Sequence, residues 1–259
     1  MSNLINKVAV VTGASSGIGF ATSVLFSKLG AKLVLSGRNV GALENTATTC
    51  LENSLSDSKP LIVQGDLSET KNAEKLVEET IKTFGQLDIL VNNAGIWQKG
   101  SIEEEDVQGF EHCFKVNVSS IFYLTKLAVP HLIETKGNIV NVSSVGGPKA
   151  FPGLLSYCVS KAALDQFTQC VALELAPKKV RCNAVTPGVI ETELHRRGGL
   201  DEEAYTKYKE KAYKSHPLGR IGSPEDVAAA IAFLASDQSS FVTGALFPVD
   251  GGRHATCLI

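Results

Sequence analysis

The sequence predicts an α/β protein with one doubly wound parallel sheet of about seven strands, flanked by helices. Short apolar, β-branched runs alternate with longer helical stretches from one end of the chain to the other. No internal repeat or low-complexity linker interrupts this alternation. The length of 259 residues also suits two small domains, but the unbroken alternation favours a single domain over residues 1–259.

The expected strands share a run of aliphatic or β-branched residues bounded by polar or glycine positions. They are residues 8–12, 32–36, 61–64, 89–92, 138–142, 181–185 and 245–249. The expected helices fill the gaps, and include residues 18–29, 71–84, a long helix around 111–134, 154–176 and 224–236. The last begins most clearly, because Ser223 can cap it, Pro224 suits its first position and two acidic residues follow.

The long stretch at residues 188–216 departs from the alternation. It is charged, contains tyrosines and is punctuated by glycines. Long insertions in compact domains are usually functional or mobile, so we expect this segment to cover a substrate. Residues 201–203 and 207–214 most simply form a salt-bridged, solvated helix over the active site.

The bulk properties exclude several classes of partner. The net charge is −2, with acids and bases interspersed, so no basic field is available for nucleic acid or an anionic membrane. A small molecule is the expected partner. The cysteines form no C-x-x-C pair and the histidines no zinc-like cluster, so we expect no metal and reduced, mostly buried cysteines.

The N-terminal residues predict a soluble cytoplasmic protein. A strand-like run begins at Lys7, which leaves too short a stretch for a signal peptide or a membrane span.

The segment 12–19, Thr-Gly-Ala-Ser-Ser-Gly-Ile-Gly, follows an expected strand and opens an expected helix. Glycines at such a junction let the backbone approach a pyrophosphate closely, and the helix N-terminus offers unpaired N–H groups. The spacing G-x-x-x-G-x-G differs from the usual G-x-G-x-x-G fingerprint. By itself it indicates dinucleotide binding only moderately.

The same residues also spell G-x-S-x-G, the nucleophile elbow of α/β-hydrolases, with Ser15 as the nucleophile. The position of this motif in the chain disfavours the hydrolase alternative. The elbow would lie on the first strand, and no earlier strand and loop would remain to supply an oxyanion hole.

Arg38 follows the second expected strand, where an acidic residue would accept the hydroxyls of an adenosine ribose. A carboxylate there would repel a 2′-phosphate, whereas a guanidinium can pair with it. The sequence therefore favours NADP(H) over NAD(H), although an ordinary surface arginine remains an alternative.

Ser144, Tyr157 and Lys161 combine an acid/base with a hydrogen-bond donor. Ser144 follows the strand 138–142, and Tyr157 and Lys161 lie one turn apart on one face of the next helix. Moving a phenol pKa from ~10 to ~7 requires roughly 4 kcal/mol, which an ammonium about 4 Å away supplies at an effective dielectric near ~20. The alternative is an exposed helix pair beside an ordinary strand-end serine.

With these motifs in order, the chain resembles the short-chain dehydrogenase/reductase family over essentially its full length. The ending 243–252 and residues 216–226 resemble the branch that contains 3-oxoacyl-acyl-carrier-protein reductases. This resemblance implies a single Rossmann-type domain and a typically tetrameric assembly. It also implies a catalytic tetrad of Asn117, Ser144, Tyr157 and Lys161, with Asn117 holding a water that links Lys161 to solvent.

The resemblance further implies residues that contact the dinucleotide. Asp66 and Leu67 would bracket the adenine, Lys161 would bind the nicotinamide ribose, and Val189 and Thr192 would hold the nicotinamide amide. The complete expected set is Gly13, Ser15, Ser16, Gly17, Ile18, Gly19, Arg38, Asp66, Leu67, Asn93, Ala94, Gly95, Tyr157, Lys161, Pro187, Gly188, Val189 and Thr192.

The implied activity is hydride transfer between the dinucleotide and a carbonyl or secondary alcohol. Ser144 and Tyr157 would donate hydrogen bonds to the carbonyl oxygen, and Tyr157 would give up the proton. Because the expected lining is mostly apolar, we rank a steroid, terpenoid or xenobiotic carbonyl above a 3-oxoacyl thioester. A non-catalytic dinucleotide sensor is a weaker alternative, because the tetrad is complete. The expected lining is Ile96, Trp97, Val145, Phe151, Leu154, Val189 and the segment 188–216.

Overall fold

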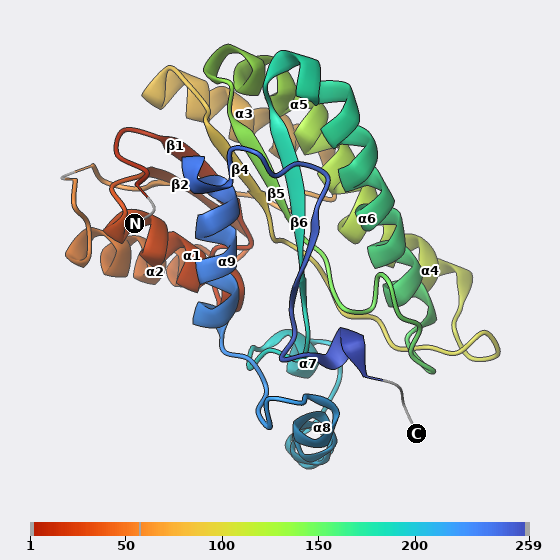
Figure 1. Cartoon of the computed structure of the whole chain (residues 1–259). Coiled ribbons are helices and arrows are strands. Elements are labelled where there is room, and N and C mark those ends of the chain that lie inside the picture. Colours follow the sequence, from red (N-terminus) through yellow and green to blue (C-terminus); the bar gives the residue numbers. More distant parts are fainter. Residues whose placement is uncertain (1–2, 57, 257–259) are drawn as a thin grey trace.

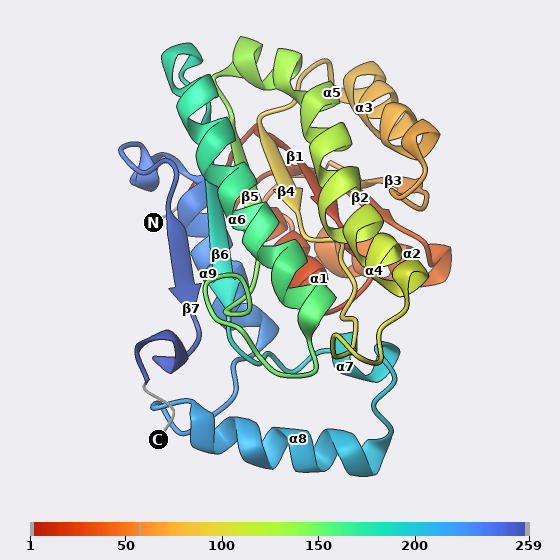
Figure 2. The same cartoon turned by 90° about the vertical axis from the view of Figure 1, so that its right-hand side faces the viewer.

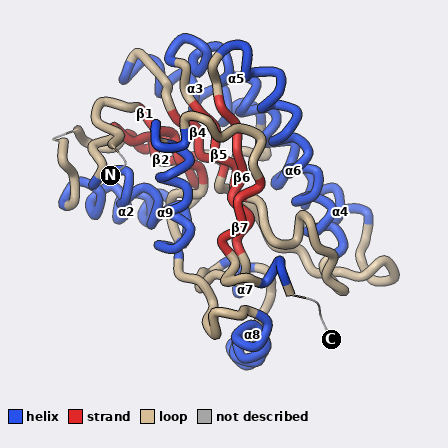
Figure 3. Tube along the Cα trace, viewed as in Figure 1, coloured by secondary structure: helices blue, strands red, loops and turns tan. Residues whose placement is uncertain are grey.

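The computed structural model describes residues 3–56 and 58–256 and contains one parallel sheet of seven strands. Their order is β3-β2-β1-β4-β5-β6-β7, and Figure 3 shows them as one twisted layer between helices. The predicted fold is confirmed. The strands are β1 Val8–Thr12, β2 Lys32–Gly37, β3 Leu61–Gln64, β4 Ile89–Asn92, β5 Asn138–Val142, β6 Arg181–Pro187 and β7 Leu246–Val249.

Helices cover both faces of the sheet, with α1, α2 and α9 on one side and α3, α5 and α6 on the other (Figure 1). Their bounds are α1 Gly17–Lys28, α2 Val40–Glu52, α3 Thr70–Phe84, α4 Val107–Phe114, α5 Ser120–Thr135, α6 Leu155–Leu175, α7 Leu194–Arg197, α8 Glu202–Ser215 and α9 Pro224–Ala235. Successive side chains of each strand point to opposite faces of the sheet, so every strand contributes to the hydrophobic core on each face. Val8 and Val10 pack with α3, α5 and α6, whereas Ala9 and Val11 pack with α1, α2 and α9.

The strand order places a crevice at the centre of the sheet. β1 pairs with β2 on one side and with β4 on the other, so the chain connections diverge between β1 and β4. In open α/β sheets, ligands bind outside the carboxyl ends of the strands at this reversal point. The loops after β1, β4, β5 and β6 therefore converge on one site.

The long helix expected around residues 111–134 is interrupted. It consists of α4, a π-helical turn Lys115–Ser119 that contains Asn117, and α5. π-turns inside helices occur frequently at functional sites. The start of α9 is confirmed, because Ser223 and Asp226 form a reciprocal capping box and Pro224 is the first helical residue.

The helical run Val107–Thr135 has a mean hydropathy of 1.2, so by length and composition it could cross a membrane. Core helices of soluble proteins pass the same test. Here α5 buries Leu124, Ala128 and Leu132 against the sheet, and this packing accounts for its apolar character.

The segment 188–216 contains α7 and α8. Figure 2 shows α8 lying across the end of the molecule toward which the strands point. The predicted salt-bridged helix is confirmed, since Lys207 pairs with Glu203 at 2.6 Å and Asp201 caps α8 by accepting from the Ala204 N–H at 2.8 Å. The segment thus lies at the carboxyl edge of the sheet, and its role in covering a substrate stays a prediction.

Candidate active site

The glycine loop between β1 and α1 depends on the absence of side chains. Gly13 and Gly17 have φ values of +63° and +54°, in the left-handed region that favours glycine. A Cβ on Gly19 would lie 2.3 Å from the carbonyl oxygen of Gly13. The turn is therefore as tight as the sequence predicted.

Asn93 fixes this loop to the end of β4. Its side-chain amide donates to the carbonyl oxygens of Thr12 at 2.8 Å and Gly13 at 3.2 Å. The Thr12 hydroxyl in turn accepts from the N–H groups of Asn93 and Ala94, each at 2.9 Å. The Asn93 side chain thus braces the glycine loop, which leaves its amide less free for the dinucleotide contact that the family resemblance implied.

A cavity of about 620 Å³ extends from this loop to Tyr157. It is lined by all the predicted dinucleotide residues except Gly19, which packs behind the loop. The predicted apolar lining is also confirmed. The lining includes Ile96, Trp97, Val145, Phe151, Leu154 and Val189.

Arg38 lies in the nucleotide half of this cavity. Its guanidinium is 3.9 Å from the Asp66 carboxylate, and both side chains are largely solvent-exposed. Exposed pairs of this kind contribute little to stability. Arg38 is therefore held loosely and remains accessible to an anion.

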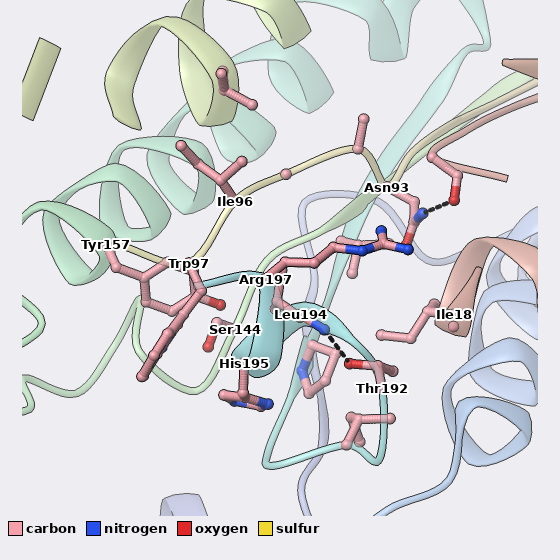
Figure 4. Close-up of a pocket in the computed structure, with 18 of the residues that line it drawn as sticks. Ile18, Asn93, Ile96, Trp97, Ser144, Tyr157, Thr192, Leu194, His195 and Arg197 are labelled. Carbon is pink, nitrogen blue, oxygen red and sulfur yellow. Dashed lines mark hydrogen bonds between the residues drawn. The ribbon is translucent and has the colours of Figure 1, made fainter. Parts of the chain in front are cut away.

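Ser144 and Tyr157 lie together at the other end. Ser144 follows β5 and accepts a hydrogen bond from the Gly146 N–H at 3.0 Å, and its hydroxyl also hydrogen-bonds to that of Tyr157. Figure 4 shows the two hydroxyls adjacent, with Trp97 and His195 beside them. This geometry provides two O–H donors that can converge on a single substrate oxygen.

Lys161 does not activate Tyr157 in this arrangement. Its ammonium donates to the Val142 carbonyl at 2.9 Å and lies 5.8 Å from the centre of the Tyr157 ring. Burial raises the pKa of Tyr157, and the Ser144 hydrogen bond offsets this only partly. Burial also lowers the pKa of Lys161 to about 8. The expected lowering of the Tyr157 pKa is therefore wrong in this arrangement, because desolvation outweighs the hydrogen bond from Ser144, the one cause that lowers it.

Asn117 lies behind these residues and does not line the cavity. Its amide accepts from the Ile96 N–H at 2.9 Å and donates to the Ile96 carbonyl at 3.0 Å and the Ser160 hydroxyl at 3.1 Å. A Cβ on Gly95 would lie 3.2 Å from Asn117 Oδ1 and 3.7 Å from Lys161 Nζ. The bare backbone at Gly95 therefore leaves space between Asn117 and Lys161.

Residues that the sequence did not assign individually complete the substrate end. His195 and Tyr208 lie in the segment 188–216, which was expected to line the cavity, and the His195 ring lies 5.2 Å from that of Trp97 and 4.8 Å from that of Tyr208. Arg253 also lines the cavity and stacks over Phe151 at 4.6 Å. These residues come from segments far apart in the sequence, and only the position of Arg253 directly after two glycines hinted at its role.

The five cysteines within residues 3–56 and 58–256 form no disulfide, and no metal site is visible among those residues. As predicted, most of the cysteines are buried, whereas Cys170 is exposed and Cys257 lies outside the described residues. Ser15 has no hydrogen bond to a histidine in the described part of the chain, so no hydrolase triad forms around it.

The fold and the cleft together define a Rossmann-type oxidoreductase that uses a nicotinamide dinucleotide. The sequence profile described as "Enoyl-(Acyl carrier protein) reductase" matches residues 13–254, and the chain belongs to the short-chain dehydrogenase/reductase family. Membership of this family excludes the hydrolase alternative.

Individual relatives cover the whole chain. Meso-2,3-butanediol dehydrogenase of Serratia marcescens is 37% identical, over 97% of this chain and 96% of that protein. A 3-oxoacyl-[acyl-carrier-protein] reductase of Thermotoga maritima is 38% identical, over 96% of this chain and 98% of that protein. The crystal structure of a short-chain dehydrogenase/reductase of unknown function from Caenorhabditis elegans, solved with cofactor, matches with a TM-score of 0.92 and 34% identity, covering 98% of this chain and 97% of that one.

Proposed function

We propose that the protein interconverts a carbonyl and a secondary alcohol on a mainly hydrophobic small molecule, with NADP(H) as the redox partner. The adjacent hydroxyls of Ser144 and Tyr157, at the apolar end of a crevice that begins at the glycine loop, support this most directly. The relatives are consistent with it, since they include both a diol dehydrogenase and an oxoacyl reductase.

The residues present fit a dinucleotide. The cavity is continuous from Gly13 and Arg38 to Tyr157, and the left-handed glycines bring backbone N–H groups to its wall. When bound, the dinucleotide supplies or accepts the hydride. In our proposal, Asp66 and Leu67 bracket the adenine, Lys161 binds the ribose, and Val189 and Thr192 hold the amide.

The negative charge that grows on the carbonyl oxygen during reduction indicates the catalytic roles of Ser144 and Tyr157. Ser144 and Tyr157 donate hydrogen bonds to the carbonyl oxygen, and Tyr157 transfers its proton to that oxygen during reduction. The buried phenolate that forms then requires a nearby positive charge, which Lys161 provides once it exchanges Val142 for the ribose hydroxyls. A water held at Asn117 would return a proton from solvent through Lys161. Alcohol oxidation reverses these steps.

The preference for NADP(H) depends on Arg38. Its guanidinium is exposed and only loosely paired with Asp66, so it can bind a 2′-phosphate in bidentate fashion. Asp66 remains in the same part of the cavity, which leaves NAD(H) as the alternative.

A 3-oxoacyl thioester is the second candidate substrate, because a relative with that activity matches nearly the whole chain. A non-catalytic dinucleotide sensor is disfavoured by the paired hydroxyls and the buried Lys161. A cytoplasmic location and a homotetramer also remain proposals.

To test this proposal, ketones and an acetoacetyl thioester are assayed with NADPH and NADH in parallel, and secondary alcohols with the oxidised dinucleotides. The change in nicotinamide absorbance measures the rate. We expect turnover of apolar ketones with NADPH preferred, and a loss of about a thousandfold in kcat for Tyr157→Phe, in line with removal of a general acid. Dinucleotide binding without turnover of any panel member would favour the sensor. A preference for NADH would contradict the role of Arg38.

A further inference from the structure

The substrate end of the cavity contains a positive charge that the proposed reaction does not use. Arg253 is half-buried and lines the cavity together with Ser144 and Tyr157. Its guanidinium lies 4.6 Å above the ring of Phe151. The aromatic ring covers one face of the guanidinium and leaves its N–H edges available for hydrogen bonds.

The backbone holds Arg253 firmly in this position. The Asp250 carboxylate accepts from the N–H groups of Gly252 at 3.0 Å and His254 at 2.6 Å. Lys149 donates to the carbonyl oxygen of Arg253 at 3.2 Å. Three hydrogen bonds therefore fix the short turn that carries Arg253, so the guanidinium is anchored rather than loosely attached to the surface.

No carboxylate in residues 3–56 or 58–256 forms an ion pair with Arg253. The acids that line the cavity are engaged elsewhere, since Asp66 faces Arg38 and Glu193 pairs with Arg196 at 2.8 Å. A half-buried guanidinium without an anion is costly. The site is thus electrostatically incomplete without a ligand.

Two cavity-lining side chains near Arg253, those of Tyr208 and His195, add polar groups and no negative charge. Arg253 donates to the Tyr208 hydroxyl, whose own O–H can still donate. His195 is buried and its Nδ1 has no hydrogen-bond partner. Burial, reinforced by the charge of Arg253, lowers the pKa of His195 to about 4, so the ring is neutral at pH 7.

The two other arginines at the cavity, Arg38 and Arg197, serve a different part of it. Figure 4 shows Arg197 extending toward Asn93 and the glycine loop. Its charge is therefore directed at the nucleotide half, and Arg253 is the arginine of the substrate half.

We propose that the substrate is an oxo acid, or the matching hydroxy acid in the oxidative direction, whose carboxylate binds Arg253 and Tyr208. Its carbonyl lies at Ser144 and Tyr157, and an apolar body between the two groups contacts Trp97. This inference rests on the proposed carbonyl reduction and specifies its substrate class. Guanidinium and carboxylate match in bidentate geometry, and the aromatic neighbours suit an aryl or alkyl body.

Matched substrate pairs test the proposal. Phenylglyoxylate, benzoylpropionate and benzoylbutyrate place the carboxylate at increasing distances from the ketone, and each has a neutral methyl ester. We expect kcat/KM for at least one acid to exceed that for its ester by about 10- to 100-fold, the range for a hydrogen bond to a charged group. In Arg253→Gln the acid-to-ester ratio should fall to about one, while Arg253→Lys should retain part of it.

Arg197→Gln is the matched control. It removes an arginine from the nucleotide half and should change the KM for the dinucleotide while the acid-to-ester ratio stays high. If the wild type shows no preference for any acid over its ester, or if Arg253→Gln keeps the preference, the proposal is overturned.

Binding provides a second measurement that does not depend on turnover. Trp97 is the one tryptophan of the chain and lines the substrate end, so its fluorescence should respond to the acids and much less to the esters. Acid-selective quenching that Arg253→Gln abolishes would support the subsite even if no ketone were reduced. Reduction of neutral ketones without acid selectivity would leave the proposed function intact and refute only the oxo-acid inference.

Discussion

His216 joins the end of α8 to Val189 in the loop after β6. Its Nε2 accepts a hydrogen bond from the Val189 N–H at 3.1 Å, and its Nδ1 lies 2.6 Å from the Ala212 carbonyl oxygen. A carbonyl only accepts, so Nδ1 carries the proton and Nε2 is the acceptor. The neutral ring thereby connects the end of α8 to the backbone that would hold the nicotinamide amide.

Replacing His216 with alanine should therefore loosen the dinucleotide site. We expect His216→Ala to raise the KM for the dinucleotide by about 30-fold, because a net hydrogen bond is worth roughly 1 kcal/mol and two are lost. Steady-state kinetics with a fixed ketone measure it. His131→Ala, at a partly exposed position on α5, is the control and should leave KM unchanged. An unaltered KM in His216→Ala would show that the loop does not need this contact.

The alkaline limb of the pH profile should report Lys161. Burial lowers the pKa of its ammonium to about 8, and kcat/KM follows the ionisation of the free enzyme. We expect kcat/KM for ketone reduction to decline above about pH 8, as the charge that supports the Tyr157 phenolate is lost. Initial rates between pH 6 and 10 measure this. Lys161→Arg, which stays charged, should be slower but lack the decline, and a flat wild-type profile up to pH 10 would contradict the assignment.

Asp165 lies one turn beyond Lys161 and carries a buried carboxylate whose Oδ1 has no hydrogen-bond partner. Burial raises its pKa to about 6 from an ordinary 3.8. A raised carboxyl pKa stabilises the folded state below the unfolded value, and this contribution is lost as the pH rises through 6. At pH 8 the ionised Asp165 therefore costs stability, by up to about 3 kcal/mol.

Asp165→Asn should consequently unfold at higher urea than the wild type at pH 8, with the difference shrinking at pH 5. The carboxylate also raises the pKa of Lys161, so the alkaline decline in activity should move to lower pH in this variant. Urea titrations at both pH values and the pH–rate profile measure the two effects. Glu111→Gln, at an exposed position, should show neither. A variant less stable than the wild type at pH 8 would mean that Asp165 is stabilised by its surroundings.

The sequence predicted correctly those features that are determined by residues close together in the chain. The glycine loop and the Tyr157–Lys161 spacing are set within one or two turns of chain, so their positions were predicted correctly. The ionisation of Tyr157 was not, because burial depends on the whole fold and here raises the pKa of the phenol more than the Ser144 hydrogen bond lowers it. Arg253 escaped prediction for a related reason, since only the sheet topology brings the C-terminal turn to the cavity that segment 188–216 lines.

The outer face formed by α5 and α6 carries large apolar side chains in contact with solvent. Phe122 is 53% exposed and Leu173 77% exposed, and Phe122 packs edge-on against Phe167 across the two helices. Exposed apolar surface of this kind marks interaction sites, so we expect Phe122→Glu combined with Leu173→Glu to reduce the assembly. Light scattering after size exclusion should give the wild type about four times the chain mass of 27.5 kDa and the variant less. Leu55→Glu, at another exposed leucine, should keep the wild-type mass, and a monomeric wild type would refute the proposed homotetramer.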